Sequence, residues 1–125
     1  MVTASYLNNS NSCLIIKVID KFDGKPIESA TVCITDSRDY YYTDKDGLTT
    51  KILLSSSLKA VTIIIYKKGF HDYIRLSTKI YPNTTRTGIV INLIPMENEE
   101  DTAPTIETEI PDEEYINLLL KNNKK

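Results

Sequence analysis

The chain is poor in the residues that build catalytic and metal sites. It has 125 residues, with a single histidine, His71, and two cysteines, Cys13 and Cys33. One histidine excludes a His–His metal pair, and the two cysteines lack metal-ligand spacing. We expect both thiols to be reduced and to act as small apolar side chains rather than to form a disulfide, as is usual in a cytosolic protein. The sequence thus predicts no metal, no cofactor and no enzyme.

Long apolar runs are also missing, since no stretch approaches the ~18 residues of a membrane span. Residues 1–12 (MVTASYLNNSNS) are polar and have neither a basic start nor an apolar stretch, which predicts a flexible arm and no signal peptide. We therefore expect a protein without membrane association. It would be cytoplasmic, or assembled from the cytoplasm into a spore-like or virion-like structure.

The chain has no large excess of positive charge, and its formal net charge is −2. Residues 1–96 hold 12 Lys and Arg against 8 Asp and Glu, a net charge of +4, whereas residues 97–125 hold 3 against 9, a net charge of −6. A body this weakly basic predicts no nucleic-acid partner. The acidic tail and the basic body can simply attract each other.

What the sequence does contain is short segments of alternating polarity, the pattern of half-buried β-strands. The predicted strands are 13–20, 30–36, 39–43, 48–54, 60–67, 73–81 and 87–94. Strand 60–67 (AVTIIIYK) is apolar on both faces, which favours a central position. In strand 73–81 the alternation predicts that Ile74, Leu76 and Ile80 point inward. Seven strands at roughly ten-residue spacing are typical of an all-β sandwich.

Turn residues separate these strands. Asp23-Gly24 and Asp44-Lys45-Asp46-Gly47 combine a carboxylate that can bond its own backbone with a residue that tolerates positive φ. Asp44 and Asp46, with Asp36 or Asp39, also suggest calcium. The DKDG segment lacks the further acidic ligands of an EF-hand loop, however, and a hairpin turn explains it fully.

A longer pattern runs through these strands and turns. It reads V-x-D, then G-x-P-I-x-x-A-x-V-x-I, then T-D-x-D-G and a later G-F. The matching residues are Val18, Asp20, Gly24, Pro26, Ile27, Ala30, Val32, Ile34, Thr43, Asp44, Asp46, Gly47, Gly69 and Phe70. In this pattern the chain resembles the carboxypeptidase regulatory-like family of transthyretin-like (prealbumin-like) domains. The resemblance implies a seven-strand prealbumin-like Greek-key β-sandwich over residues 13–96.

The continuation KKGFHDYIRLSTKIYPNTTRTGIVINLIP is similar to the N-terminal sandwich domain of clostridial spore-cortex-lytic enzymes. This likeness implies a role beside spore or cell-wall hydrolysis machinery. Some transthyretin-like proteins hydrolyse 5-hydroxyisourate with several histidines and a C-terminal Tyr-Arg-Gly-Ser motif. The chain has neither feature, so the resemblance does not imply that activity.

Related collagen-adhesin pilin domains join a first-strand lysine to a last-strand asparagine through an isopeptide bond. Lys17 and Asn92 stand in similar contexts. The assisting acid would lie where this chain has Ile63, Ile64 and Ile65, so we expect no bond and a snorkelling or edge lysine.

The composition changes after residue 96. Residues 97–111 are acidic and proline-punctuated, which predicts an extended linker. Residues 112–125 return to helical character, with acidic residues first and lysines last. One apolar stripe of this predicted short amphipathic helix holds Tyr115, Ile116, Leu119 and Leu120. A helix this short needs a surface to pack on, either its own sandwich or a partner protein.

Consecutive tyrosines form a second candidate binding surface. Tyr40, Tyr41 and Tyr42 must use both faces of a strand, so at least one is exposed, and Tyr66, Tyr73 and Tyr81 could extend the patch. Tyrosines suit recognition of protein or cell-wall glycan. Together these features predict a non-catalytic binding or assembly module with the C-terminal helix as a tether to a protein partner. The alternative is a structural subunit of a phage or phage-like particle.

Overall fold

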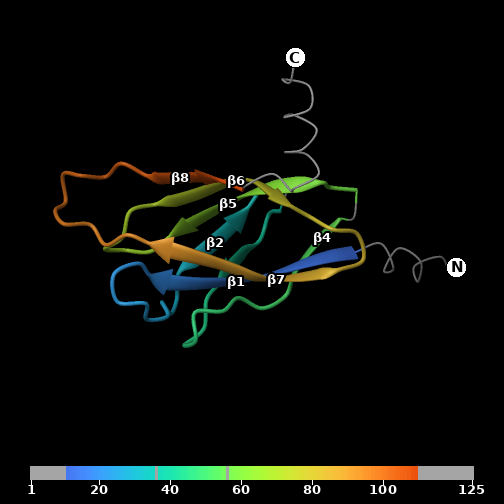
Figure 1. The fold of residues 1–125 in the computed structure, drawn as a ribbon, viewed down its shortest axis with the longest axis horizontal. Helices are drawn as coiled ribbons and strands as arrows, with labels where there is room; N and C mark the ends of the chain where they lie inside the picture. The colour runs from blue at the N-terminus through green and yellow to red at the C-terminus, as the bar shows by residue number, and fades with distance from the viewer. Residues whose placement is uncertain (1–10, 36, 56, 110–125) are drawn as a thin grey trace, which may run out of the picture.

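A computed structural model describes residues 11–35, 37–55 and 57–109, and the described chain is all-β (Figure 1). Its eight strands are β1 (Asn11–Asp20), β2 (Thr31–Ile34), β3 (Tyr40–Tyr42), β4 (Ile52–Ser55), β5 (Ala60–Tyr66), β6 (Tyr73–Lys79), β7 (Thr85–Leu93) and β8 (Thr105–Thr108). No described helix is long and apolar enough to cross a membrane.

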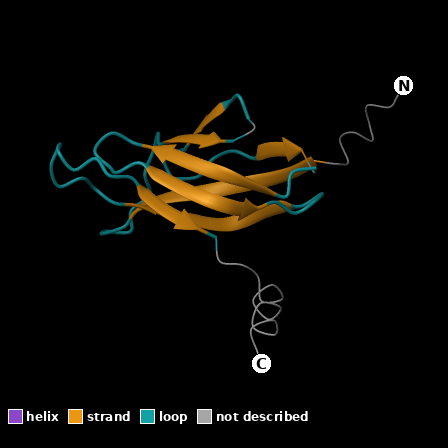
Figure 2. Ribbon diagram, turned by 90° about the horizontal axis from the view of Figure 1, so that it is seen from above, coloured by secondary structure: helices purple, strands orange, loops and turns teal. Residues whose placement is uncertain are grey.

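The strands form two mixed sheets. A three-stranded sheet has the order β4-β1-β7, and a five-stranded sheet has the order β3-β2-β5-β6-β8. Two neighbouring pairs, β1 with β7 and β6 with β8, are parallel, whereas the other pairs are antiparallel. Seen from above, the strands run roughly along the long axis of the molecule (Figure 2). As its sequence predicts, β5 lies at the centre of the larger sheet.

The two sheets share one hydrophobic core. Strands β2, β4 and β5 alternate a buried apolar residue with a more exposed one, the pattern expected where one face of a sheet is covered. The fully buried aliphatic side chains come from both sheets and include Leu14, Ile16, Val18, Ile52 and Ile91 from one, and Val32, Ile63 and Ile65 from the other. The all-β prediction is therefore confirmed.

The strand number differs from the prediction. Seven strands appear close to their predicted positions, and an eighth, β8, forms within the stretch predicted as a linker, residues 97–111. Residues 105–108 pair in parallel with β6 and extend the five-stranded sheet. Residues 105–108 contain few apolar side chains, because an edge strand buries few of them, and the sequence therefore gave no signal for this strand. Most of the predicted N-terminal arm and all of the predicted C-terminal helix lie outside the described residues.

The inward face of β6 was also predicted wrongly. Ile74 and Leu76 lie on the outer side of the sheet, while the ring of Tyr73 is buried in the core; Ile80 points inward as expected. Ser77 has a φ of 57°, and the pairing with β5 shifts register at this point. An irregularity of this kind reverses the alternation between the two halves of a strand.

The turn chemistry is as predicted. Asp44 Oδ1 accepts hydrogen bonds from the backbone N–H groups of Asp46 (2.8 Å) and Leu48 (3.0 Å), which closes the DKDG turn. Asp20 Oδ1 accepts from the backbone N–H of Phe22 (2.7 Å) at the preceding turn. Both carboxylates hold the backbone of their turns by hydrogen bonds, which is the role that the sequence predicts for Asp44.

Lys17 and Asn92 lie on β1 and β7 with exposed side chains. Because β1 is the middle strand of its sheet, Lys17 is not an edge residue, which corrects that part of the prediction.

Gly47 occupies the most crowded position of the four glycines. It has a φ of +77°, and a Cβ there would lie 2.5 Å from the Val18 carbonyl oxygen. Gly24 has a similar φ of +73°, yet a Cβ there would meet nothing within 4 Å. We predict that Gly47→Ala lowers the free energy of unfolding by about 3 kcal/mol, because a clash adds to the strain. Gly24→Ala should cost about 1 kcal/mol, from strain alone. Urea denaturation measures both, and equal losses would contradict the steric account.

Candidate functional site

The outer face of the five-stranded sheet carries a continuous row of apolar side chains. The pairing registers align Tyr40 of β3, Cys33 of β2, Ile64 of β5, Ile74 of β6 and Ile106 of β8. This apolar row crosses all five strands. Its two ends are the most exposed, with Tyr40 at 64% and Ile106 at 58% of full exposure.

Neighbouring positions on the same face are also uncharged. Tyr42, Thr31 and Tyr66 form a second row on one side, and Leu76 pairs with Thr108 on the other. None of the side chains in these rows carries a charge, although 26% of all residues in the chain are charged. A contiguous exposed apolar patch is the usual mark of an interaction surface.

The outer face of the three-stranded sheet is different. Leu53 and Val90 are exposed there, but Val90 pairs with the exposed Lys17, and Lys51 precedes β4. A charged residue at the middle strand breaks the apolar surface. The two sheets therefore differ in what their outer faces can bind.

The tyrosines of the predicted binding surface are exposed only in part. Tyr40 and Tyr42 are exposed on β3, and Tyr66 extends the surface on β5 at 54% exposure. Tyr41, which was also predicted to bind a partner, is half-buried and packs against the core. Two further tyrosines lie elsewhere, Tyr73 in the core and Tyr81 near β7. The stripe of Tyr115, Ile116, Leu119 and Leu120 lies outside the described residues.

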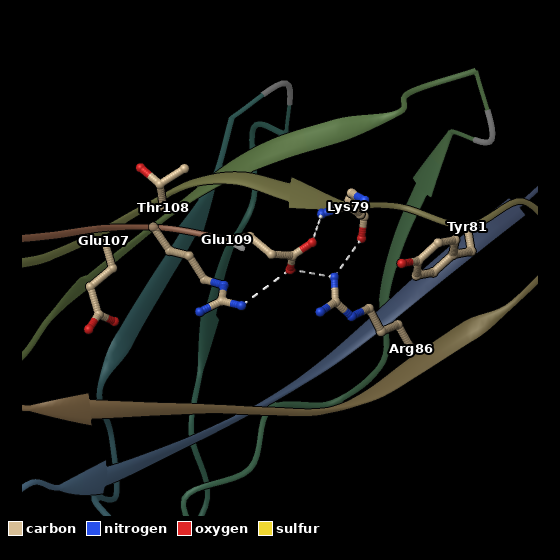
Figure 3. Close-up of a pocket in the computed structure, with 7 residues that line it drawn as sticks. Lys79, Tyr81, Arg86, Glu107, Thr108 and Glu109 are labelled. Carbon is tan, nitrogen blue, oxygen red and sulfur yellow. Dashed lines mark hydrogen bonds and ion pairs between the residues drawn. The ribbon is translucent and has the colours of Figure 1, made fainter. Parts of the chain in front are cut away.

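A second feature is a hollow of about 620 Å³ near the open edge between β7 and β8 (Figure 3). Its lining is mostly charged and consists of Arg75, Lys79, Tyr81, Arg86, Glu107, Thr108 and Glu109. Glu107 and Glu109 point from β8 and its end toward β7, whereas Thr108 points away, as strand alternation requires (Figure 3).

Glu109 is the centre of this cluster. Its Oε1 atom lies 3.2 Å from Arg75 Nη2 and 2.7 Å from Arg86 Nη1, and its Oε2 accepts from the backbone N–H of Lys79 at 3.1 Å. Only 8% of the Glu109 side chain is exposed. Arg75 belongs to β6 and Arg86 to β7, so one carboxylate links the two sheets. The arginines are already arranged around a carboxylate of the chain itself, which makes the cluster a structural clamp.

Tyr73 and Glu107 form a second link between β6 and β8. The Tyr73 hydroxyl donates a hydrogen bond to Glu107 Oε1 at 2.5 Å. Burial, supported by this hydrogen bond, raises the pKa of Tyr73 to about 12. Burial alone would lower the pKa of Arg75, but its interactions with Tyr73 and Glu109 outweigh that effect and the pKa is raised.

The titratable residues singled out from the sequence are dispersed. Cys13 and Cys33 are free, half-buried thiols on different sheets, and burial raises the pKa of Cys33. The His71 ring nitrogen Nδ1 lies 2.8 Å from the Ala103 carbonyl oxygen, a loop contact. Within residues 11–35, 37–55 and 57–109, no three His, Cys, Asp or Glu side chains lie close enough to hold a metal ion.

Sequence reasoning missed most of the apolar row and the whole clamp. Ile64 could be recognised, because strand 60–67 is apolar on both faces and so must expose one of them. Ile106 and Glu109 had no such signal, since they lie in the stretch predicted as a linker. Their positions depend on the parallel pairing of β8 with β6, which involves residues about thirty positions apart.

Comparison with protein-family models gives no match for this chain, and no curated protein sequence matches it. The family resemblance seen in the sequence therefore remains a proposal.

Glu109→Gln tests the clamp. The substitution keeps the shape but leaves two arginines facing each other without their counter-charge. We predict a loss of about 2 kcal/mol in the free energy of unfolding, less than for a fully buried pair. Hydrogen exchange of the β8 amides should accelerate while that of β1 does not. The matched control is Glu100→Gln on an exposed loop, which should change neither quantity. Equal exchange in both variants would contradict a clamp at Glu109.

The Tyr73 hydroxyl predicts a pH dependence. A tyrosine with a folded-state pKa of about 12 stabilises the fold fully below its unfolded pKa of about 10, and the contribution is lost as the pH rises from 10 to 12. Tyr73→Phe should cost about 1 kcal/mol at pH 7 and should remove this part of the alkaline loss. Urea denaturation between pH 8 and about pH 12 measures it. An alkaline stability loss as steep in Tyr73→Phe as in the native chain would rule the assignment out.

Proposed function

We propose that this chain is a non-catalytic binding or assembly module whose binding surface is the outer face of the five-stranded sheet. The observation that supports the proposal is the apolar row from Tyr40 to Ile106, which is uncharged and which no other described segment covers. Burying such a surface against a partner is favourable at about 25 cal/mol per Å² of apolar area, before the costs of association.

A protein partner fits this surface better than a glycan. Sugar-binding surfaces combine aromatic rings with polar groups that bond hydroxyls, whereas the middle of the apolar row is built from Ile64 and Ile74, with Cys33 beside them. The exposed tyrosine hydroxyls of this face belong to Tyr40 and Tyr42 of the edge strand β3 and to Tyr66 at the end of β5. The proposed partner is therefore a protein with a complementary apolar surface.

We further propose that the domain is a prealbumin-like Greek-key β-sandwich of the carboxypeptidase regulatory-like family. The sequence pattern supports this, as does the arrangement of the first seven strands in two sheets around one core. A role beside spore or cell-wall hydrolysis machinery rests on the sequence resemblance alone.

Charge placed on the apolar row tests the proposal. Ile64→Asp and Ile106→Asp alter exposed side chains of the five-stranded sheet, and Leu53→Asp and Val90→Asp are matched controls on the other sheet. We expect the first pair to lower the capture of partner proteins from a native lysate at least tenfold, and the controls to leave it unchanged. Quantitative mass spectrometry measures the captured proteins, and circular dichroism checks folding. Binding that survives both changes on the apolar row would refute this surface.

A further inference from the structure

One edge of β6 binds an extended strand, and in the described chain β8 occupies it. Residues 105–108 pair in parallel with β6. Two backbone hydrogen bonds frame this pairing, from the N–H of Thr105 to the Asp72 carbonyl oxygen (2.8 Å) and from the N–H of Glu109 to the Leu76 carbonyl oxygen (3.1 Å). Backbone pairing of this kind gives affinity for an extended segment, whereas side chains give selectivity.

Side chains beside this edge select glutamates two residues apart. The Tyr73 hydroxyl donates a hydrogen bond to Glu107. Arg75 and Arg86 both contact the Glu109 carboxylate. The two glutamates lie on the same side of an extended strand, because its side chains alternate. The β6 edge with Tyr73, Arg75 and Arg86 is termed the strand site. It matches a Glu-x-Glu pattern in an extended segment, whichever chain supplies that segment.

Strand β8 is held in the strand site by polar contacts rather than by burial. Three of its four residues are exposed, and its apolar side chain, Ile106, is 58% exposed. Release of the strand therefore uncovers little apolar surface, and local opening is easiest in such segments. Release also leaves a free strand edge and two arginine side chains, only 19% and 22% exposed, that have lost Glu109. The strand site thus favours being filled, but it can change its occupant.

The connection to β8 is long enough for such a change. The Met96 N–H bonds the Gly69 carbonyl oxygen at 2.9 Å, which fixes the chain up to residue 96. Residues 97–104 join this point to β8 and lie outside the strands. Four of these eight residues are acidic and none is basic, and linkers with charges of one sign tend to extend. When extended they span up to about 26 Å, enough to carry β8 to an adjacent copy.

We propose that the strand site binds β8 of a second copy of this chain in exchange for its own. The second copy supplies Glu107 and Glu109 in the same register, so every contact described above forms again between the two chains. Exchange of an identical element is a low-cost route to dimers. The chain's own strand competes at an effective concentration of roughly 1 mM, so exchange requires the second copy at a similar concentration. This inference goes beyond the proposed function, and it holds whether or not the apolar row binds another protein.

Two differently tagged versions of the full chain test the exchange. Both carry Cys13→Ala and Cys33→Ala. One adds Leu76→Cys in the strand site and the other adds Thr108→Cys in β8, because positions 76 and 108 are neighbours in the observed pairing. The two are mixed at about 1 mM each and mildly oxidised, and mass spectrometry follows the disulfide-linked heterodimer. The matched control replaces Thr108→Cys by Tyr66→Cys, an exposed position on the same face of the sheet.

The proposal predicts that the heterodimer linked through positions 76 and 108 forms at least about ten times faster than the control, since a seated strand holds the two positions together. No disulfide between these positions of different chains overturns the proposal. Equal rates in the two mixtures also overturn it, because they assign the contact to the outer faces of the sheets.

Glu109→Gln, placed in one chain at a time, tests whether the arginines select the strand. In the chain with Leu76→Cys it weakens that chain's own β8 and leaves the strand site intact for the β8 of the other. We expect heterodimer formation to become about tenfold faster, because the competing strand is released more often.

In the chain with Thr108→Cys, the same Glu109→Gln change should leave the rate near that of the parent mixture. Easier release of β8 is then offset by its weaker binding to the other chain, which has lost the same carboxylate contact. An equal acceleration in both placements overturns the proposal, because general loosening of the fold acts alike in either chain.

Discussion

A single core shared by two sheets is the constraint on which the rest of the structure depends. Both sheets must turn one apolar face inward, and the aliphatic residues of β1, β2, β4, β5 and β7 meet that demand by simple alternation. Strand β6 does so differently. It places the Tyr73 ring inward, and the irregularity at Ser77 restores inward packing at Ile80. The consequence is that Ile74 and Leu76 are turned outward, which completes the apolar row.

The clamp at Glu109 solves a different problem, the attachment of a short edge strand with few apolar residues. Strand β8 cannot be held by burial, since three of its four residues are exposed. It is held instead by backbone pairing to β6 and by charge-assisted hydrogen bonds, which are stronger than neutral ones. The result is that β8 supplies Ile106 to the apolar row from an otherwise polar stretch.

Much of the fold could be predicted from the sequence, because the signals were local. Alternating polarity located seven strands, and Asp-Gly pairs located two turns. In such a turn the carboxylate accepts hydrogen bonds from backbone N–H groups, and the glycine adopts a positive φ. Which side chains of β6 point inward could not be predicted, because this depends on a bulge at Ser77, and no distinctive residue marks it. Nor could the clamp, since Arg75, Arg86 and Glu109 come together only through pairing of distant strands. For the candidate binding residues, the sequence predicted only that at least one of three consecutive tyrosines is exposed, and the exposed ones are Tyr40 and Tyr42.

The charges at β8 also have a consequence for edge-to-edge pairing of the larger sheet with another chain. Without β8, one edge of the larger sheet would be β6, a seven-residue strand whose unpaired N–H and C=O groups could pair with another chain. Strand β8 covers much of that edge with only four residues. Glu107 and, just after the strand, Glu109 point toward β7, where a second sheet added edge to edge would have to accommodate their charges (Figure 3). Short edge strands and inward-pointing charges are known protections against edge-to-edge aggregation. The acidic stretch after the seventh strand thus protects the sheet that it extends.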